Sequence, residues 1–104
     1  MESKAKVSYT NDVLSVHLSG RLDAANAPAL SDELTKYKGK PIKNMVFFAK
    51  DLEYISSAGI RVIVFAKQRI GENATIYLIG APETVLDVIR MTGLANFMVI
   101  QDSY

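Results

Sequence analysis

The sequence predicts an α/β fold in which one mixed β-sheet is packed by helices, with the elements in the order ββαβαβαβ. Two alternating segments joined by a tight turn open the chain. Beyond them, helical and strand spacings of apolar residues take turns to the end of the chain. The length of 104 residues suits a single hydrophobic core. We therefore expect one domain that spans residues 1–104.

The first two strands are predicted to form a hairpin at one side of the sheet. Residues 4–9 and residues 13–19 each alternate between apolar and polar side chains. Asn11-Asp12 lies between them and is typical of a tight turn. His17 falls on the polar face, so we expect that face to be solvated.

The first helix is predicted after a turn at residues 20–23. Apolar residues recur at helical spacing from Ala27 to Tyr37. Asn26 is expected to cap the helix, and Pro28 suits its first turn. Gly39 marks the stop.

The central part of the chain combines a clear strand with an ambiguous segment. The apolar run at residues 44–49 predicts a central strand that is covered on both faces, and residues 50–56 are expected to form a connection. Residues 60–70 allow two interpretations. Their β-branched side chains favour a strand, but their apolar positions also fit one helical face that runs on to Gly71. We prefer the helix.

The last third of the chain repeats the strand–helix–strand pattern. Residues 75–79 are predicted to form a strand, and a helix is expected from Pro82 to a stop at Gly93. Its inner side would carry Val85, Leu86 and Ile89. Residues 97–100 are predicted to form a short final strand.

Composition excludes several classes of protein. The formal net charge is +1 with acids and bases interspersed, which argues against direct nucleic-acid binding. The chain has no cysteine, so disulfides, thiolate metal sites and cysteine nucleophiles are excluded. Its first residues are polar, unlike a signal peptide, and its apolar runs are too short to span a bilayer. We expect a cytoplasmic protein without membrane contact.

The sequence shows no set of catalytic residues. His17 is the only histidine, and we expect it on the surface without a partner for a metal site or a Ser-His-Asp triad. No glycine-rich phosphate-binding motif is present. Asp51 and Glu53 are expected to be solvated charges. We expect no enzymatic activity, no metal and no cofactor.

The Ser56-Ser57-Ala58-Gly59 segment has two interpretations. A serine before a helix commonly serves as its N-cap, because its oxygen accepts a backbone N–H of the first turn. The same helix end tolerates a phosphate, because it presents unpaired N–H groups and the positive end of the helix dipole. Arg61 lies one helical turn after Ser57 and is spaced to pair with such a phosphate. A plain cap and a phosphorylatable switch are both open at this point.

Two motifs resemble the STAS domain of bacterial anti-sigma factor antagonists. Residues 51–60 resemble the signature segment of that family, and residues 20–24 resemble its Gly-x-Leu-Asp turn. Thr92-Gly93-Leu94 after the last helix also matches. The resemblance covers nearly the whole chain. It implies a STAS-like domain with helices packed mainly on one face of the sheet, and it supports a helix at residues 60–70.

The resemblance implies an anti-sigma factor antagonist that acts by exchanging partners. In that family, the unphosphorylated antagonist binds an anti-sigma factor that is also a serine kinase, and binding releases the sigma factor. The kinase then uses ATP to phosphorylate one serine of the antagonist, and a PP2C-type phosphatase reverses this step. The family's phosphorylated serine stands two residues before the glycine, which is Ser57 here, with Ser56 as the alternative.

The resemblance also implies a partner-binding surface and two departures from the family pattern. The surface comprises Arg21, Asp23, Ala24, Asn26, Ser56, Ala58, Gly59 and Arg61. As alternatives, Asp23 would be only a turn residue and Arg61 a solvated helix charge. Ser56 stands where many members have Asp, and Phe48 stands where members often have Asp or Asn. Losing these acids would change how a kinase docks.

A second function stays open. The chain would then be a STAS interaction module that is never phosphorylated, in a stress-sensing complex or in a lipid-transport ABC system. Under that hypothesis Ser57 is only a helix cap. In either case, we expect the free chain to be monomeric.

Overall fold

Five strands form one mixed sheet whose spatial order, β1-β2-β3-β4-β5, is also their order along the chain. The computed structural model describes residues 4–104, so the predicted polar start and domain edge at residues 1–3 lie outside the described residues. The strands are β1 (Lys4–Thr10), β2 (Val13–Leu22), β3 (Asn44–Ile55), β4 (Thr75–Ile79) and β5 (Val99–Gln101). β1 runs antiparallel to β2, and the other neighbouring strands are parallel.

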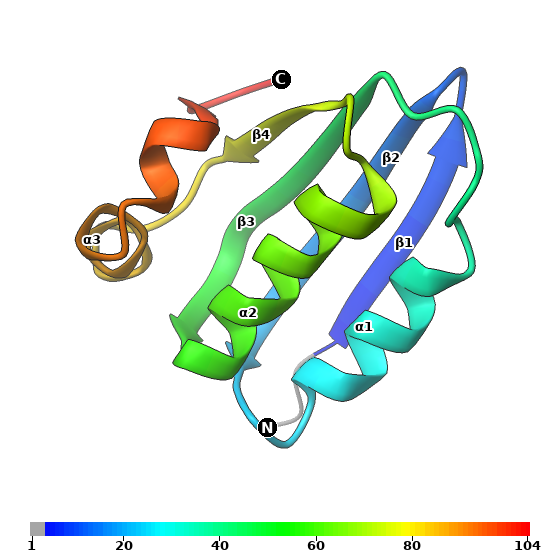
Figure 1. Ribbon diagram of the computed structural model, residues 1–104. Coiled ribbons are helices and arrows are strands. Elements are labelled where there is room, and N and C mark those ends of the chain that lie inside the picture. Colours follow the sequence, from blue (N-terminus) through cyan, green and yellow to red (C-terminus); the bar gives the residue numbers. More distant parts are fainter. Residues whose placement is uncertain (1–3) are drawn as a thin grey trace.

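The helices cover one face of this sheet, as Figure 1 shows for α1 and α2. The helical segments are α1 (Ala27–Thr35), α2 (Ser57–Phe65), the π-helical η1 (Ala66–Ile70), α3 (Glu83–Met91) and the 3-10 turn η2 (Leu94–Phe97). Leu34 of α1, Ile63 of α2 and Ile89 of α3 are buried in one core cluster with Phe47 of β3. The predicted fold class and the element order ββαβαβαβ are therefore confirmed.

Several local predictions agree with the structure. Asn11 and Asp12 have φ angles of 53° and 64°, as the two central residues of a type I′ hairpin turn require. Residues 60–70 are helical, so the strand interpretation is wrong. Gly93 ends α3 in the left-handed conformation, with φ 77°. His17 is exposed on the polar face of β2, as expected.

The predicted connection at residues 50–56 is wrong, because β3 continues to Ile55. β2 also extends beyond its predicted end, to Leu22, and its last residues pair with this part of β3. Irregular pairing shifts the side-chain alternation, so that Ala49, Leu52 and Ile55 are all buried. Polar residues between these positions conceal the strand from a search for strict alternation.

Three predictions about element ends are also wrong. Asn26 makes no side-chain cap; its backbone is already near-helical, with φ −115° and ψ −11°, and its side chain turns back into the preceding loop. α1 ends at Thr35, before the predicted last position at Tyr37. The final strand is Val99–Gln101, not residues 97–100. Phe97 belongs to the turn η2, which begins directly after Gly93.

The face of the sheet opposite the helices carries a cluster of aromatic rings, which we call the open-face cluster: His17, Phe48, Tyr77 and Tyr104. The rings of His17 and Phe48 stack with their centroids 4.4 Å apart. Tyr104 packs edge-on against Tyr77 at 5.0 Å and against Phe48 at 6.3 Å. Val46 is also completely buried on this face, and it does not belong to the core cluster on the helix side. The prediction that residues 44–49 are covered on both faces is thus confirmed for the centre of the strand.

Candidate partner-binding site at the start of α2

Ser56 is the N-cap of α2. Its backbone is extended, with φ −94° and ψ 176°, and its Oγ accepts a hydrogen bond from the Gly59 N–H at 3.4 Å. A serine in this position satisfies one of the unpaired N–H groups of the first turn. The side-chain cap is therefore provided by Ser56, and the idea that Ser57 caps the helix is wrong.

Ser57 is the first residue of α2, and it is exposed. Its hydroxyl accepts a hydrogen bond from Arg61 Nη2 at 3.4 Å, across the one-turn spacing expected from the sequence. Arg61 is also exposed. The two adjacent serines thus differ in role: the Ser56 hydroxyl is half-buried and engaged with the backbone, whereas the Ser57 hydroxyl faces outwards beside a guanidinium.

Gly59 lets α2 approach the ends of β2 and β3. It is buried, and a Cβ at this position would lie 2.8 Å from both Ile55 Cγ1 and the Leu22 carbonyl oxygen. Real Cβ atoms do not come this close to other atoms, so only glycine fits without a shift of the backbone. The Ser56 N–H also donates to the Leu22 carbonyl at 2.9 Å. These contacts fix the start of α2 against the end of β2.

The loop between β2 and α1 is braced by Asn26. Its Oδ1 accepts from the Asp23 N–H at 2.9 Å, and its Nδ2 donates to the Arg21 carbonyl at 2.6 Å. Asp23 Oδ1 in turn accepts from the Ala25 N–H at 3.1 Å, so Asp23 does act as a turn residue. Ala24 stands exposed in this loop. The side chains of Asn26 and Asp23 thus hold the shape of the loop.

Arg21 is an exposed cation near the end of β2, next to this loop, and its position depends on a residue that the sequence did not indicate. Its guanidinium carbon lies 4.2 Å from the centre of the Tyr54 ring, and its Nε lies 3.7 Å from Asp23 Oδ2. A guanidinium over an aromatic face is a favourable cation–π arrangement. Tyr54 is the register partner of Arg21 across β2 and β3. The pair of Arg21 and Tyr54 can be predicted only if β3 is known to extend to Ile55.

The two predicted motifs therefore meet at one edge of the sheet. β2 and β3 are parallel, so the loops that follow their carboxyl ends lie side by side, and the Ser56–Leu22 hydrogen bond joins them. Of the predicted surface, the exposed members are Arg21, Ala24 and Arg61, and the predicted phosphorylation site Ser57 is exposed beside them. Ala58 is half-buried and Gly59 is buried, so Gly59 contributes packing to the site.

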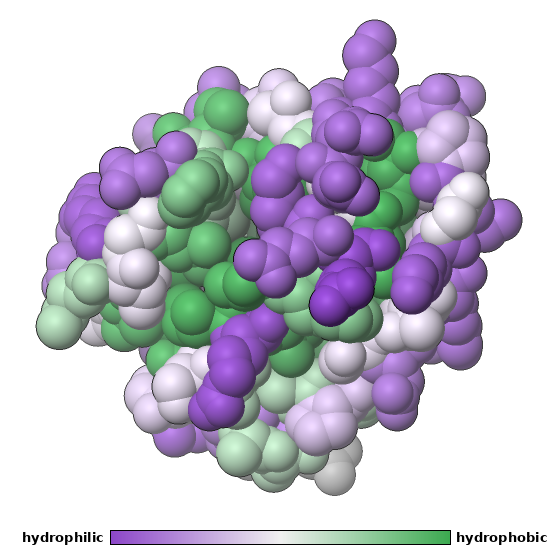
Figure 2. Space-filling view, in the orientation of Figure 1, coloured by the Kyte–Doolittle hydropathy of each residue, from purple (hydrophilic) through white to green (hydrophobic). Residues whose placement is uncertain are grey.

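An apolar groove that the sequence did not indicate lies beside α2. It has a volume of about 370 Å³ and is lined by Ile60, Val64, Lys67, Gln68, Thr92, Gly93, Leu94 and Phe97. Figure 2 shows this apolar surface to the left of α2, towards α3. The groove depends on Phe97 lying in the turn η2, whereas the sequence predicts a strand at that residue.

Two kinds of feature are absent from residues 4–104: a cluster of metal-ligating side chains and a membrane-spanning helix. Within residues 4–104, no three His, Cys, Asp or Glu side chains gather closely enough to hold a metal ion. No helix in this part of the chain combines the length and the apolar character needed to cross a membrane.

A comparison with curated proteins finds a relative of similar length. BtrV of Bordetella bronchiseptica, which is named as a candidate anti-sigma factor antagonist, is 29% identical over 101 residues. The match covers 96% of this chain and 87% of BtrV.

Solved structures share the fold at lower identity. An anti-sigma factor antagonist from Mycobacterium paratuberculosis superposes with a TM-score of 0.84 at 19% identity, covering 98% of this chain and 87% of that one. The anti-sigma factor antagonist SpoIIAA in its unphosphorylated form gives 0.75 at 11% identity, covering 99% and 90%. The phosphorylated form of Bacillus SpoIIAA gives 0.73 at 14% identity, covering 93% and 90%.

The family itself is decided by a match to a family model. The model for the STAS domain matches residues 4–104. This range includes every strand and helix described above and both motifs at the edge of the sheet. The chain therefore belongs to the STAS domain family.

Proposed function

We propose that this chain is an anti-sigma factor antagonist of the bacterial cytoplasm, acting as one STAS domain over residues 1–104. In its unphosphorylated form it binds an anti-sigma factor serine kinase through the surface around Arg21, Ser57 and Arg61, and the sigma factor is released. Phosphorylation of Ser57 weakens this complex, and a PP2C-type phosphatase restores it. The kinase supplies ATP and the catalytic groups, and this chain supplies the acceptor hydroxyl.

The observation that carries this proposal is the different structural role of each serine: the Ser56 side chain caps α2, and the Ser57 side chain is exposed. Ser56 occupies the capping position, so modification of Ser57 would leave the side-chain cap of α2 intact. Its hydroxyl is exposed at the first residue of a helix, where the dipole and the free N–H groups favour negative charge. A phosphate on Ser57 is therefore compatible with an intact fold. The relative SpoIIAA, with the same fold, has been solved in both phosphorylated and unphosphorylated forms.

Arg61 gives the modification a physical consequence. A phosphate brings roughly −1.5 to −2 charges. Arg61 already contacts the Ser57 hydroxyl, so its guanidinium would pair with the phosphate and would no longer be available to a partner. The local surface would change from cationic to anionic while the helix stays in place. Such a change suits a partner that recognises Arg61 or that approaches Ser57 closely.

The proposal is tested by phosphorylation with a purified anti-sigma factor kinase of the same organism. Wild-type protein, Ser57→Ala and Ser56→Ala are incubated with the kinase, Mg²⁺ and ATP, and their intact masses are measured. We expect one phosphate on the wild type and on Ser56→Ala, and none on Ser57→Ala. An adduct that persists in Ser57→Ala and disappears in Ser56→Ala would move the site to Ser56.

Binding of the kinase separates the proposal from a constitutive interaction module. Affinity for the kinase is measured for the unmodified and the phosphorylated protein. We expect a loss of at least about tenfold on phosphorylation, which corresponds to about 1.4 kcal/mol. A wild-type chain that acquires no phosphate while still binding its partners would instead support a module that is never phosphorylated.

A further inference from the structure

Tyr54 is an exposed aromatic residue near the end of β3, close in the sequence to the cap of α2. It is 42% exposed, and only Ile55 separates it from Ser56. Across the parallel strands β2 and β3 its register partner is Arg21. The ring therefore stands beside a residue of the surface proposed for the anti-sigma factor kinase.

The Tyr54 ring supports the guanidinium of Arg21 from one side. The guanidinium carbon lies 4.2 Å from the centre of the ring, so one face of the group is covered. Its Nε lies 3.7 Å from Asp23 Oδ2. A free arginine side chain samples many rotamers, and fixing them when a partner binds reduces the affinity. These two contacts restrict Arg21 before any partner arrives.

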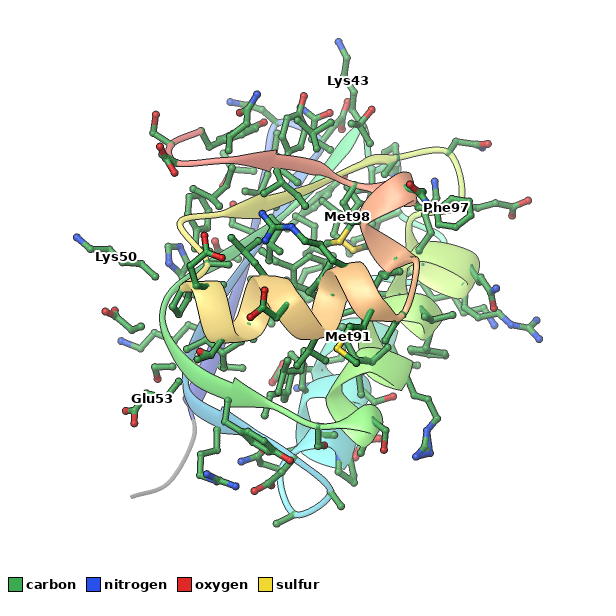
Figure 3. All side chains as sticks on the ribbon, turned by 90° about the vertical axis from the view of Figure 1, so that its left-hand side faces the viewer. Lys43, Lys50, Glu53, Met91, Phe97 and Met98 are labelled. Carbon is green, nitrogen blue, oxygen red and sulfur yellow. The ribbon has the colours of Figure 1, made fainter. Side chains whose placement is uncertain are left out.

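The Nη end of Arg21 is open to a partner. The side chain is 56% exposed, and among residues 4–104 its Nη groups donate no hydrogen bond and form no ion pair. Glu53, which precedes Tyr54, points away from the body of the molecule in Figure 3 and makes no ion pair with Arg21. The planar fork of a guanidinium matches the two oxygens of a carboxylate.

The charges of the proposed surface favour an acidic group on the partner. Its charged members are two cations, Arg21 and Arg61, and one acid, Asp23. Asp23 already lies beside Arg21 and accepts the Ala25 N–H, so the charge left for a partner is positive. A phosphate on Ser57 would add negative charge to the same surface and would repel an acidic partner.

We propose that Arg21 binds a carboxylate of the anti-sigma factor kinase and that Tyr54 is the positioning residue that orients Arg21 for this contact. The inference rests on the proposed function, because it names the chemistry on the kinase side of the same interface. Arg21 makes the contact, and Tyr54 acts through it. An exposed cation–π pair is a modest interaction, so Tyr54 adjusts the affinity and does not decide it.

A double-mutant cycle tests the positioning role. The Kd for a purified anti-sigma factor kinase of the same organism is measured without ATP, so that Ser57 stays unmodified. Arg21→Ala should raise the Kd by about tenfold or more, as for other arginines central to an interface. Tyr54→Leu should raise it by about threefold to fivefold. In the Arg21→Ala background, Tyr54→Leu should change the Kd by less than about 1.5-fold, because its effect passes through Arg21.

Charge reversal tests the chemistry of the partner. Arg21→Glu should bind the kinase more weakly than Arg21→Ala, because it brings a like charge to the partner's carboxylate. Equal or tighter binding by Arg21→Glu would rule out an acidic group at this contact.

Three measurements separate positioning from a merely structural role. Tyr54→Phe keeps the aromatic face and should bind within about 1.5-fold of the wild type. Tyr104→Leu is the matched control: it removes a tyrosine that is 55% exposed but belongs to the open-face cluster, and it should bind like the wild type. The ring current of Tyr54 should shift the δ-CH₂ proton resonances of Arg21 in the wild type and in Tyr54→Phe, and this shift should vanish in Tyr54→Leu.

The outcomes distinguish this inference from the proposed function. If the wild type binds the kinase and accepts a phosphate while Tyr54→Leu binds equally well, the positioning role is wrong and the proposed function stands. A loss in Tyr54→Leu that persists in the Arg21→Ala background would overturn it too, because Tyr54 would then contact the kinase directly. Coupling between Arg21 and Tyr54 without any phosphate transfer would support the contact and overturn the switch. A kinase that does not bind the wild type would overturn both.

Discussion

Ser56 and Ser57 have the same side chain but different environments, because α2 begins between them. Ser56 is the last residue before the helix, and Ser57 is the first residue in it. Ser56 is extended and its oxygen turns inwards to the Gly59 N–H, whereas Ser57 is already helical and its oxygen points to Arg61. The sequence indicated that a serine would cap the helix, but it could not say which one. That choice depends on where β3 ends, and the end of β3 was mispredicted.

Replacing Ser56 tests the cap directly. Ser56→Ala removes the acceptor for the Gly59 N–H, so the free energy of unfolding should fall by about 1 kcal/mol. Ser56→Asp should recover this loss, because a carboxylate both caps the helix and interacts favourably with its positive end. Urea denaturation of the three proteins measures the differences. An unchanged stability in Ser56→Ala would contradict the assignment of Ser56 as the cap.

Gly59 is the position where the site is most sensitive to size. Gly59→Ala would bring a methyl group within 2.8 Å of the Leu22 carbonyl oxygen, so α2 must move away from β2. We expect a loss of about 1 to 3 kcal/mol in the free energy of unfolding, the usual cost of overpacking. Ser57→Ala, on the exposed side of the same helical turn, serves as the control and should change stability by less than about 0.5 kcal/mol.

At the scale of elements, α2 and η1 show how packing overrides local propensity. The β-branched side chains of residues 60–64 favour a strand, yet Ile60 and Ile63 must face the core together, and only a helix allows this. The π-helical segment then places Ala66 and Ile70 on the buried side, with the Gly71 N–H bonded back to the Ala66 carbonyl at 2.8 Å. Periodicity predicted the helix, but the change of helical type depends on tertiary contacts.

Lys67 of η1 forms hydrogen bonds with the turn that follows this helix. Its Nζ donates to the carbonyls of Glu72 and Ala74, at 3.1 Å and 3.0 Å. Lys67→Met keeps much of the aliphatic chain and removes both bonds, so the turn at residues 71–74 should open more often. We expect faster amide exchange at Ala74 and a loss of global stability of about 1 kcal/mol. Arg69→Met, at an exposed position of the same segment, should leave that exchange rate unchanged.

At the scale of the whole molecule, the sequence predicted the order of elements, and its resemblance to the STAS family implied a surface that joins the two motifs. The sequence indicated neither the apolar groove nor the open-face cluster. The alternation in β2 and the helical spacing in α3 are dictated by burial on one face, so they are visible in the chain itself. Three other features each join segments that are distant in the sequence: the Arg21–Tyr54 pair, the groove at Phe97 and the stack of His17 on Phe48. Their positions depend on strand register and loop geometry, which a single sequence does not reveal.

The open-face cluster gives a prediction at this scale. Tyr104 packs on Phe48 and Tyr77 and makes a hydrogen bond with Asn44 Nδ2 at 2.8 Å, so it acts as a small cover over the sheet. Tyr104→Ala should lower the free energy of unfolding by about 1 kcal/mol, as expected for loss of an aromatic pair that is still partly exposed. Near-ultraviolet circular dichroism should weaken at the same time. Tyr104→Phe should keep the ring contacts and most of the stability.

The sequential strand order has a consequence for how the chain is made. Each strand pairs with the one before it, so when a strand leaves the ribosome its neighbour has already been synthesised. The sheet can therefore grow outwards from the β1–β2 hairpin without waiting for a distant segment. The carboxyl ends of β2 and β3, which lie beside Ser57, are therefore complete before β5 exists. Until β5 is made, the outer edge of β4 has no partner strand.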